Sequence, residues 1–144
     1  VFGAGGGRVA GGTLMLGRRE GAWSARDVLR HLLSSELLLS RRVSLLLSED
    51  EPSLMTRPDP PPELDTPQEV EALRSFEQYR VSRAATVAVL SGRAPADWDR
   101  AGWHVEYGRV TLAEQVSYFA AHELTHLRQL EALRRSVDTT RAGA

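Results

Sequence analysis

Three long segments with helical periodicity constrain the fold of this 144-residue chain more than any other feature. Each segment begins at a helix-capping signal: Ser24 with Asp27 three residues later, and capping boxes at residues 66–69 and 111–114. Apolar residues then recur at spacings of three and four. No alternating pattern of useful length predicts a strand. We therefore expect an all-α bundle with helices over residues 24–49, 66–91 and 111–137.

The remaining residues form flanking and connecting segments. Residues 1–20 contain seven glycines, which predicts a flexible leader. Residues 52–62 hold five of the seven prolines and predict a long crossover loop or a lid, because proline breaks both helices and central strands. We expect one helical domain over residues 21–137 and a frayed tail over residues 138–144.

The composition removes most enzymatic chemistries. All 18 basic residues are arginines, and the chain contains neither lysine nor cysteine. Schiff-base, pyridoxal and P-loop lysine chemistry is therefore excluded, as are thiolate nucleophiles, disulfides and cysteine-ligated zinc. Histidine, carboxylate, hydroxyl and arginine side chains remain to carry any reaction.

Charge and hydropathy indicate which partners to expect. The formal charge of −1 favours neither nucleic acid nor a membrane surface as a partner. No apolar run approaches the roughly 20 residues of a transmembrane helix, and the first residues lack the pattern of a secretory signal. We expect a protein of the cytoplasm without nucleic-acid or membrane partners.

Four histidines are the main candidates for chemistry. His122 and His126 lie four residues apart on the last predicted helix, so they project from one face and can bind one metal ion. His31, on the first predicted helix, can face them across a bundle, and three imidazoles with one open position form a catalytic type of metal site. Alternatively, these histidines are hydrogen-bonded core residues. For His104, in the loop before the last helix, local hydrogen bonding or solvation is the favoured interpretation.

Two glutamates fall on apolar faces of the predicted helices. Glu36 lies within the apolar stripe of the first helix, and Glu123 lies near the centre of the stripe of the last. Each should have a partner, because an unpaired buried carboxylate is costly. For Glu36 we expect an ion pair with an arginine. For Glu123, a hydrogen bond to a histidine and a catalytic role as a general base both remain open.

Residues 122–126, His-Glu-Leu-Thr-His, also satisfy the His-Glu-x-x-His pattern of zinc metallopeptidases, in which the glutamate activates water. Those enzymes take a third ligand from downstream, where this chain offers Glu131 and Asp138. No predicted strand precedes the motif. We therefore keep a peptidase as an alternative interpretation.

Residues 23–134 resemble the DinB/YfiT family of metal-dependent proteins. The resemblance rests on residues that occur in the family's order: Trp23-Ser24 opening a helix with His31 and Glu36, Phe76 and Arg80 on a middle helix, the Gly108–Leu112 segment, and Ala121-His122 with His126 and Gln129. It implies an up-and-down-type four-helix bundle with a long crossover, often dimeric. It also implies metal ligation by His31, His122 and His126. Family members have a first helix before the Trp-Ser position, and we expect this helix to be missing or degenerate here.

The resemblance and the residues together predict a three-histidine site for a divalent metal, zinc or nickel, with an open coordination position. We expect a metal-dependent hydrolase or a thiol-dependent S-transferase with a small-molecule substrate, because the family includes bacillithiol transferases and mycothiol-dependent isomerases. A low-molecular-weight thiol would come with the cofactor, since the chain lacks cysteine. Arg42 is a candidate to hold its carboxylates or phosphates. The alternative is a non-catalytic stress-response or binding module that the metal stabilises; a homodimer is expected in either case.

Overall fold

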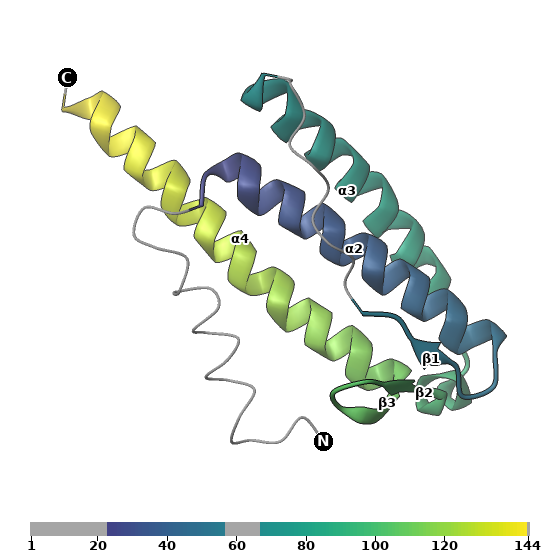
Figure 1. The fold of residues 1–144 in the computed structure, drawn as a ribbon. Coiled ribbons are helices and arrows are strands. Elements are labelled where there is room, and N and C mark those ends of the chain that lie inside the picture. The colour runs from purple at the N-terminus through teal and green to yellow at the C-terminus, as the bar shows by residue number, and fades with distance from the viewer. Residues whose placement is uncertain (1–22, 57–66, 144) are drawn as a thin grey trace.

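Three long helices and a small sheet make up the part of the chain that the computed structural model describes, residues 23–56 and 67–143 (Figure 1). Helix α2 spans Ala25–Ser48, α3 spans Gln68–Ser91 and α4 spans Leu112–Ala142. These bounds confirm the three predicted helices and the helical fold class. The predicted leader, the place of a first helix and much of the proline-rich loop lie outside the described residues.

Helix α2 lies between α3 and α4 (Figure 1). Arg30 on α2 pairs with Glu71 on α3 at 3.1 Å, and Glu36 meets Thr86 further along both helices, so α2 and α3 run parallel. Helix α4 runs in the opposite direction (Figure 1). Because two parallel neighbours cannot be joined by a tight turn, a long crossover must connect α2 to α3, as the sequence predicts.

Capping boxes begin α2 and α4, which confirms the predicted N-cap at Ser24 and the predicted box at Thr111, whereas α3 begins after Pro67 without a side-chain cap. The Ser24 hydroxyl accepts a hydrogen bond from the Asp27 N–H at 3.2 Å, and the Asp27 carboxylate accepts one from the Ser24 N–H at 3.0 Å. Thr111 and Glu114 make the same reciprocal pair at 3.1 and 2.8 Å. These bonds satisfy backbone donors that the first turn of a helix otherwise leaves without partners.

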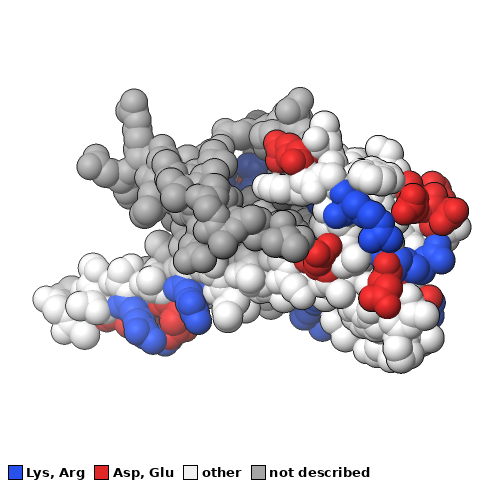
Figure 2. Space-filling view, turned by 90° about the horizontal axis from the view of Figure 1, so that it is seen from below, with Lys and Arg blue, Asp and Glu red and all other residues white. Residues whose placement is uncertain are grey.

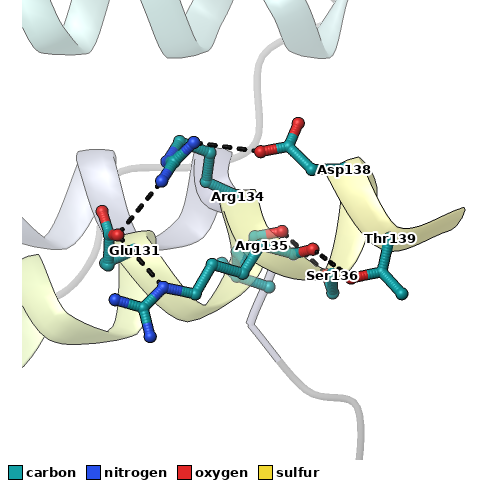
Figure 3. A network of polar contacts seen from close by, with 7 residues as sticks. Glu131, Arg134, Arg135, Ser136, Asp138 and Thr139 are labelled. Carbon is teal, nitrogen blue, oxygen red and sulfur yellow. Dashed lines mark hydrogen bonds and ion pairs between the residues drawn. The ribbon is translucent and has the colours of Figure 1, made fainter. Parts of the chain in front are cut away.

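Helix α4 continues to Ala142, so residues 138–142 are helical and the predicted frayed tail is wrong for them. Side chains three and four residues apart hold these last turns together (Figure 3): Arg134 lies 3.2 Å from Glu131 and 3.0 Å from Asp138. The Thr139 hydroxyl also donates to the Arg135 carbonyl at 2.9 Å. Ion pairs at this spacing each stabilise an exposed helix by about 0.2–0.5 kcal/mol.

A three-stranded sheet closes one end of the helices (Figure 1), and the sequence did not predict it. Strand β1 (Ser53–Leu54) pairs in parallel with β2 (Ala101–His104), which pairs antiparallel with β3 (Gly108–Thr111). A 3-10 helix at Pro95–Asp99 precedes β2. The strands contain only two to four residues, too few to produce a readable alternating pattern.

Two apolar clusters form the core. The larger lies near the sheet, around Leu46, Leu112 and Phe119, and the smaller includes Val28, Leu32 and Tyr79. Helix α3 turns polar side chains inward, whereas the apolar stripe that marks it in the sequence is exposed. The buried residues are Glu71, Ser75, Tyr79 and Thr86, and the exposed ones include Val70, Leu73, Phe76 and Val87. The expected homodimer stays a prediction.

Among the described residues, none of the helices combines the length and hydropathy needed to span a bilayer. Acidic and basic side chains lie side by side on the face seen in Figure 2 rather than gathering into a patch of one sign. This mixture matches the nearly balanced formal charge of the sequence.

Gly102 in β2 is a position where any side chain should destabilise the protein. A Cβ atom there would lie 2.6 Å from the Pro52 carbonyl oxygen, which already accepts a hydrogen bond from Trp103 N–H at 2.8 Å. We expect Gly102→Ala to lower the free energy of unfolding by about 1–3 kcal/mol, the usual range for overpacking, as measured by urea denaturation. Gly92→Ala is the control, since its Cβ would meet nothing within 4 Å. Equal stability of the two variants would contradict the packing at this strand.

Candidate metal centre

Three histidines from α2 and α4 converge on one point. His31 Nε2 lies 3.0 Å from His122 Nε2, and His126 Nε2 lies 3.2 Å from the same atom. The three donor atoms all lie within 4.8 Å of one another. His126 is fully buried, whereas His31 and His122 are partly exposed. The structure therefore brings together the three histidines that the sequence singled out, and it leaves the fourth, His104, outside the cluster.

Helix geometry explains why these rings meet. His122 and His126 are one turn apart on α4, so their side chains emerge from the same face. His31 occupies the facing position on α2, which runs antiparallel to α4. The ring centroids of His31 and His126 are 4.5 Å apart and those of His122 and His126 4.6 Å apart, so the three imidazoles also pack against each other.

A hydrogen bond to Gln129 sets the tautomer of His126. The Nδ1 atom of His126 lies 3.1 Å from Gln129 Oε1, one turn further along α4. Because an amide oxygen only accepts, the neutral ring carries its proton on Nδ1 and presents the lone pair of Nε2 to the cluster. Metal-ligating histidines are commonly fixed in this way by a partner on the second ring nitrogen.

Trp23 packs on the same group of rings. Its indole stacks on His126 at a centroid distance of 5.7 Å and an interplanar angle of 8°, and its edge contacts His31 at 5.0 Å. Tyr118 stacks on His122 at a centroid distance of 6.2 Å. Aromatic side chains thus restrict the orientation of all three imidazoles.

Arg83 connects two carboxylates beside the histidines. Its Nε lies 2.8 Å from Glu36 and its Nη2 lies 2.7 Å from Glu123, so one guanidinium on α3 reaches both other helices. Glu36 is fully buried and also accepts a hydrogen bond from the Thr86 hydroxyl at 2.5 Å. The expected ion pair of Glu36 with an arginine is confirmed. Burial, followed by the negative charge of Glu36, raises the pKa of Glu123.

This arrangement bears on the peptidase interpretation. Glu123 contacts Arg83, and the third imidazole of the cluster is His31 from α2 rather than a residue downstream of His126. Both features differ from the expected metallopeptidase pattern, in which the glutamate serves the metal-bound water. The catalytic role of Glu123 stays a prediction.

His104 belongs to a different environment, at the end of β2. Its Nδ1 accepts a hydrogen bond from the Glu106 N–H at 3.1 Å, which confirms the expected local bonding. Burial, and then the nearby positive charge of Arg42, lower the pKa of His104. The ring is therefore neutral at pH 7.

The sequence did not reveal a cavity of about 330 Å³ that lies next to the cluster. Side chains of α2, α4 and the segment around the turn between β2 and β3 line the cavity, and Arg42, His104 and Tyr118 are among its lining residues. Of these, Arg42 was expected to hold an anionic group and His104 was expected to be a locally bonded loop residue, but no cavity joining them was expected. His104 reaches the cavity through the unpredicted sheet, whereas Tyr118 lies on α4, so no local sequence pattern could have shown that they meet.

The three histidines fit a divalent cation. Tetrahedral zinc with Zn–N bonds of about 2.0–2.1 Å requires neighbouring nitrogens about 3.3 Å apart, close to the two observed distances of 3.0 and 3.2 Å. Hydrogen bonding alone explains the cluster less well, since the single Nε2 of His122 faces two other ring nitrogens. Neutral imidazoles suit zinc, nickel, copper and iron.

The fold and the histidine cluster together define a class of protein: a helical bundle in which three imidazoles converge on one point. A family model of the DinB superfamily matches residues 14–130, and the chain therefore belongs to this superfamily. Among solved structures, it is similar to YfiT from Bacillus subtilis, with a TM-score of 0.66, 18% sequence identity and coverage of 84% of this chain and 70% of YfiT. YfiT is described as a probable metal-dependent hydrolase with an unusual four-helix bundle topology. No curated protein sequence matches the chain.

Gln129 should control the affinity of the cluster for metal. We expect Gln129→Leu to weaken binding of Zn²⁺ about 10- to 100-fold, because His126 loses the acceptor that keeps its proton on Nδ1. Competition with a chromophoric chelator measures the affinity. Gln78→Leu, the same change at an exposed position of α3, serves as the control and should bind like the wild type. Unchanged affinity in Gln129→Leu would show that this hydrogen bond does not orient a ligand.

Proposed function

We propose that the chain binds one divalent metal ion through His31, His122 and His126 and acts as a metal-dependent hydrolase or thiol-dependent S-transferase on a small molecule. The convergence of one ring nitrogen from each of the three histidines within 4.8 Å is the observation that carries this proposal. The membership in the DinB superfamily and the similarity to YfiT, described as a probable metal-dependent hydrolase, support it. Zinc and nickel are the metals we favour for three neutral imidazoles.

The residues around the cluster have distinct roles in this proposal. His31, His122 and His126 hold the ion, Gln129 keeps the lone pair of His126 directed at it, and Trp23 restricts two of the rings. Three protein ligands leave a coordination position for a further group. A divalent cation at such a position lowers the pKa of a bound water or thiol and so supplies a nucleophile at neutral pH. Because the chain has no cysteine, any thiol must come from a small molecule.

Metal content tests the first part of the proposal. Protein saturated with Zn²⁺ or Ni²⁺ and then desalted should retain about one ion per chain, measured by inductively coupled plasma mass spectrometry. His31→Ala and His122→Ala should lose most of it. At a free metal concentration of 100 times Kd, the ion should also stabilise the wild type by about 2.7 kcal/mol. His104→Ala, outside the cluster, is the control and should behave like the wild type. A wild type that retains no ion would overturn the site.

An open coordination position distinguishes a catalytic site from a metal that only stabilises the helices. Cobalt-loaded protein should change its visible absorption spectrum when a low-molecular-weight thiol is added, because the thiolate enters the coordination sphere. Loading His122→Ala with cobalt in the same way gives the background. A spectrum that does not respond to thiol, hydroxide or other small ligands would favour the non-catalytic module.

A further inference from the structure

Arg83 on α3 contacts both helices that carry the three histidines. Its Nε lies 2.8 Å from Glu36 on α2, and its Nη2 lies 2.7 Å from Glu123 on α4. The side chains of these glutamates are 0% and 18% exposed, so water and salt screen the two ion pairs little. Because the guanidinium is rigid and planar, it holds the two carboxylates at a fixed distance from each other.

Neighbouring residues of α3 keep Arg83 and its buried partner in place. The guanidinium carbon of Arg83 lies 5.6 Å from the centre of the Tyr79 ring, one turn earlier on α3. The Thr86 hydroxyl, three residues after Arg83, donates to Glu36 at 2.5 Å. Residues at this spacing share one face of a helix. That face of α3 therefore presents an arginine, a ring that orients it and a hydroxyl that fixes the carboxylate it meets.

The two glutamates are close to the metal ligands along their helices. Glu123 is the residue after His122 on α4. Glu36 follows His31 by five residues, which corresponds to about 7.5 Å along the axis of α2. Arg83 thus links α2 and α4 beside the place where the imidazoles meet.

A metal centre built from two helices tolerates little movement between them. Metal–ligand distances vary by only about 0.2 Å, whereas sliding one helix by one residue moves a ligand by about 1.5 Å. Apolar contacts also join α2 and α4, but they are not directional and do not set the register. Arg42 on α2 reaches Gln115 on α4 at 2.9 Å, but it lies about 16 Å from His31 along the helix. A directional contact nearer the histidines is needed.

We propose that Arg83 is a positioning residue for the metal centre. Its ion pairs with Glu36 and Glu123 keep the imidazole of α2 in register with the two imidazoles of α4. Helix α3 contains no histidine, yet through this side chain it controls the affinity of the cluster for metal. The effect on metal rests on the proposed function, whereas the effect on the arrangement of the imidazoles in metal-free protein does not.

Zinc affinity, measured by competition with a chromophoric chelator, tests the role of Arg83. We expect Arg83→Met to weaken Zn²⁺ binding about 2- to 30-fold, the usual range for a residue that acts on a site through its neighbours. Electrostatics alone predicts the opposite sign, since a positive charge near a cation is removed. Arg80→Met, the same change at an exposed arginine of α3, is the control and should bind like the wild type. Unchanged or tighter binding in folded Arg83→Met would overturn the proposal.

Variants of Glu123 carry the test if Arg83→Met does not fold. Glu123→Leu removes only the ion pair to α4 and leaves the buried Glu36 paired with Arg83, and it should weaken Zn²⁺ binding in the same range. Glu123→Gln keeps an oxygen that accepts from Arg83 Nη2, so it should retain most of the affinity. Equal losses in the two variants would assign the effect to the charge of Glu123 and would contradict positioning.

Metal-free protein gives a readout that does not depend on the proposed function. The rings of His31 and His122 have centroids 4.9 Å apart, so NMR should detect nuclear Overhauser contacts between their protons in the wild type. These contacts should weaken in Arg83→Met and Glu123→Leu and persist in Arg80→Met. Unchanged contacts in both folded variants would overturn this inference alone. A wild type that shows the contacts but binds no Zn²⁺ would overturn the proposed function alone.

Discussion

The buried carboxylate of Glu36 is the constraint on which the arrangement of the helices depends. A fully buried charge must be neutralised, and Arg83 from α3 does so with help from the Thr86 hydroxyl. Because the same guanidinium also pairs with Glu123, its position fixes α2, α3 and α4 relative to one another. Glu36 lies five residues after His31 and Glu123 lies next to His122. The ion pairs thereby set the register in which the imidazoles of α2 and α4 face each other.

The buried polar contacts between α2 and α3, which involve Glu71, Glu36 and Arg83, form a polar layer. This layer explains the unusual orientation of α3. The helix points Glu71, Ser75 and Thr86 inward, where the first pairs with Arg30 and the last with Glu36. Its apolar residues are left on the outside as a consequence. Replacing buried ion pairs with apolar side chains often stabilises a protein. We therefore interpret the layer as a device that positions the helices relative to one another rather than as a source of stability. It divides the core into the two apolar clusters, with the histidines near the boundary.

Local sequence signals predicted most of the helical framework. Features that depend on tertiary contacts were not predicted. The capping boxes at Ser24 and Thr111 and the spacing of His122 and His126 act within one or two turns, so the sequence shows them directly. That His31 faces this pair was proposed with the help of the family resemblance, since sequence spacing cannot say which helices are neighbours. The sheet was missed because its strands are short and because β1 is held by a partner 50 residues away, with Ser53 beside Trp103. The inward face of α3 was missed because ion pairs, rather than apolar periodicity, determine it.

The histidine cluster and the cavity both use residues of α2 and α4, but only the cavity also uses residues of the sheet. The cluster is built from α2 and α4 alone, and its geometry follows from the register that Arg83 fixes. The cavity takes Arg42 and Gln115 from the same helices, but the turn between β2 and β3 provides His104 and Tyr107. Substitutions in this turn can therefore change the shape and polarity of the cavity while the imidazoles keep their positions. The lining of the cavity can thus vary independently of the histidine cluster, because the two depend on different parts of the fold.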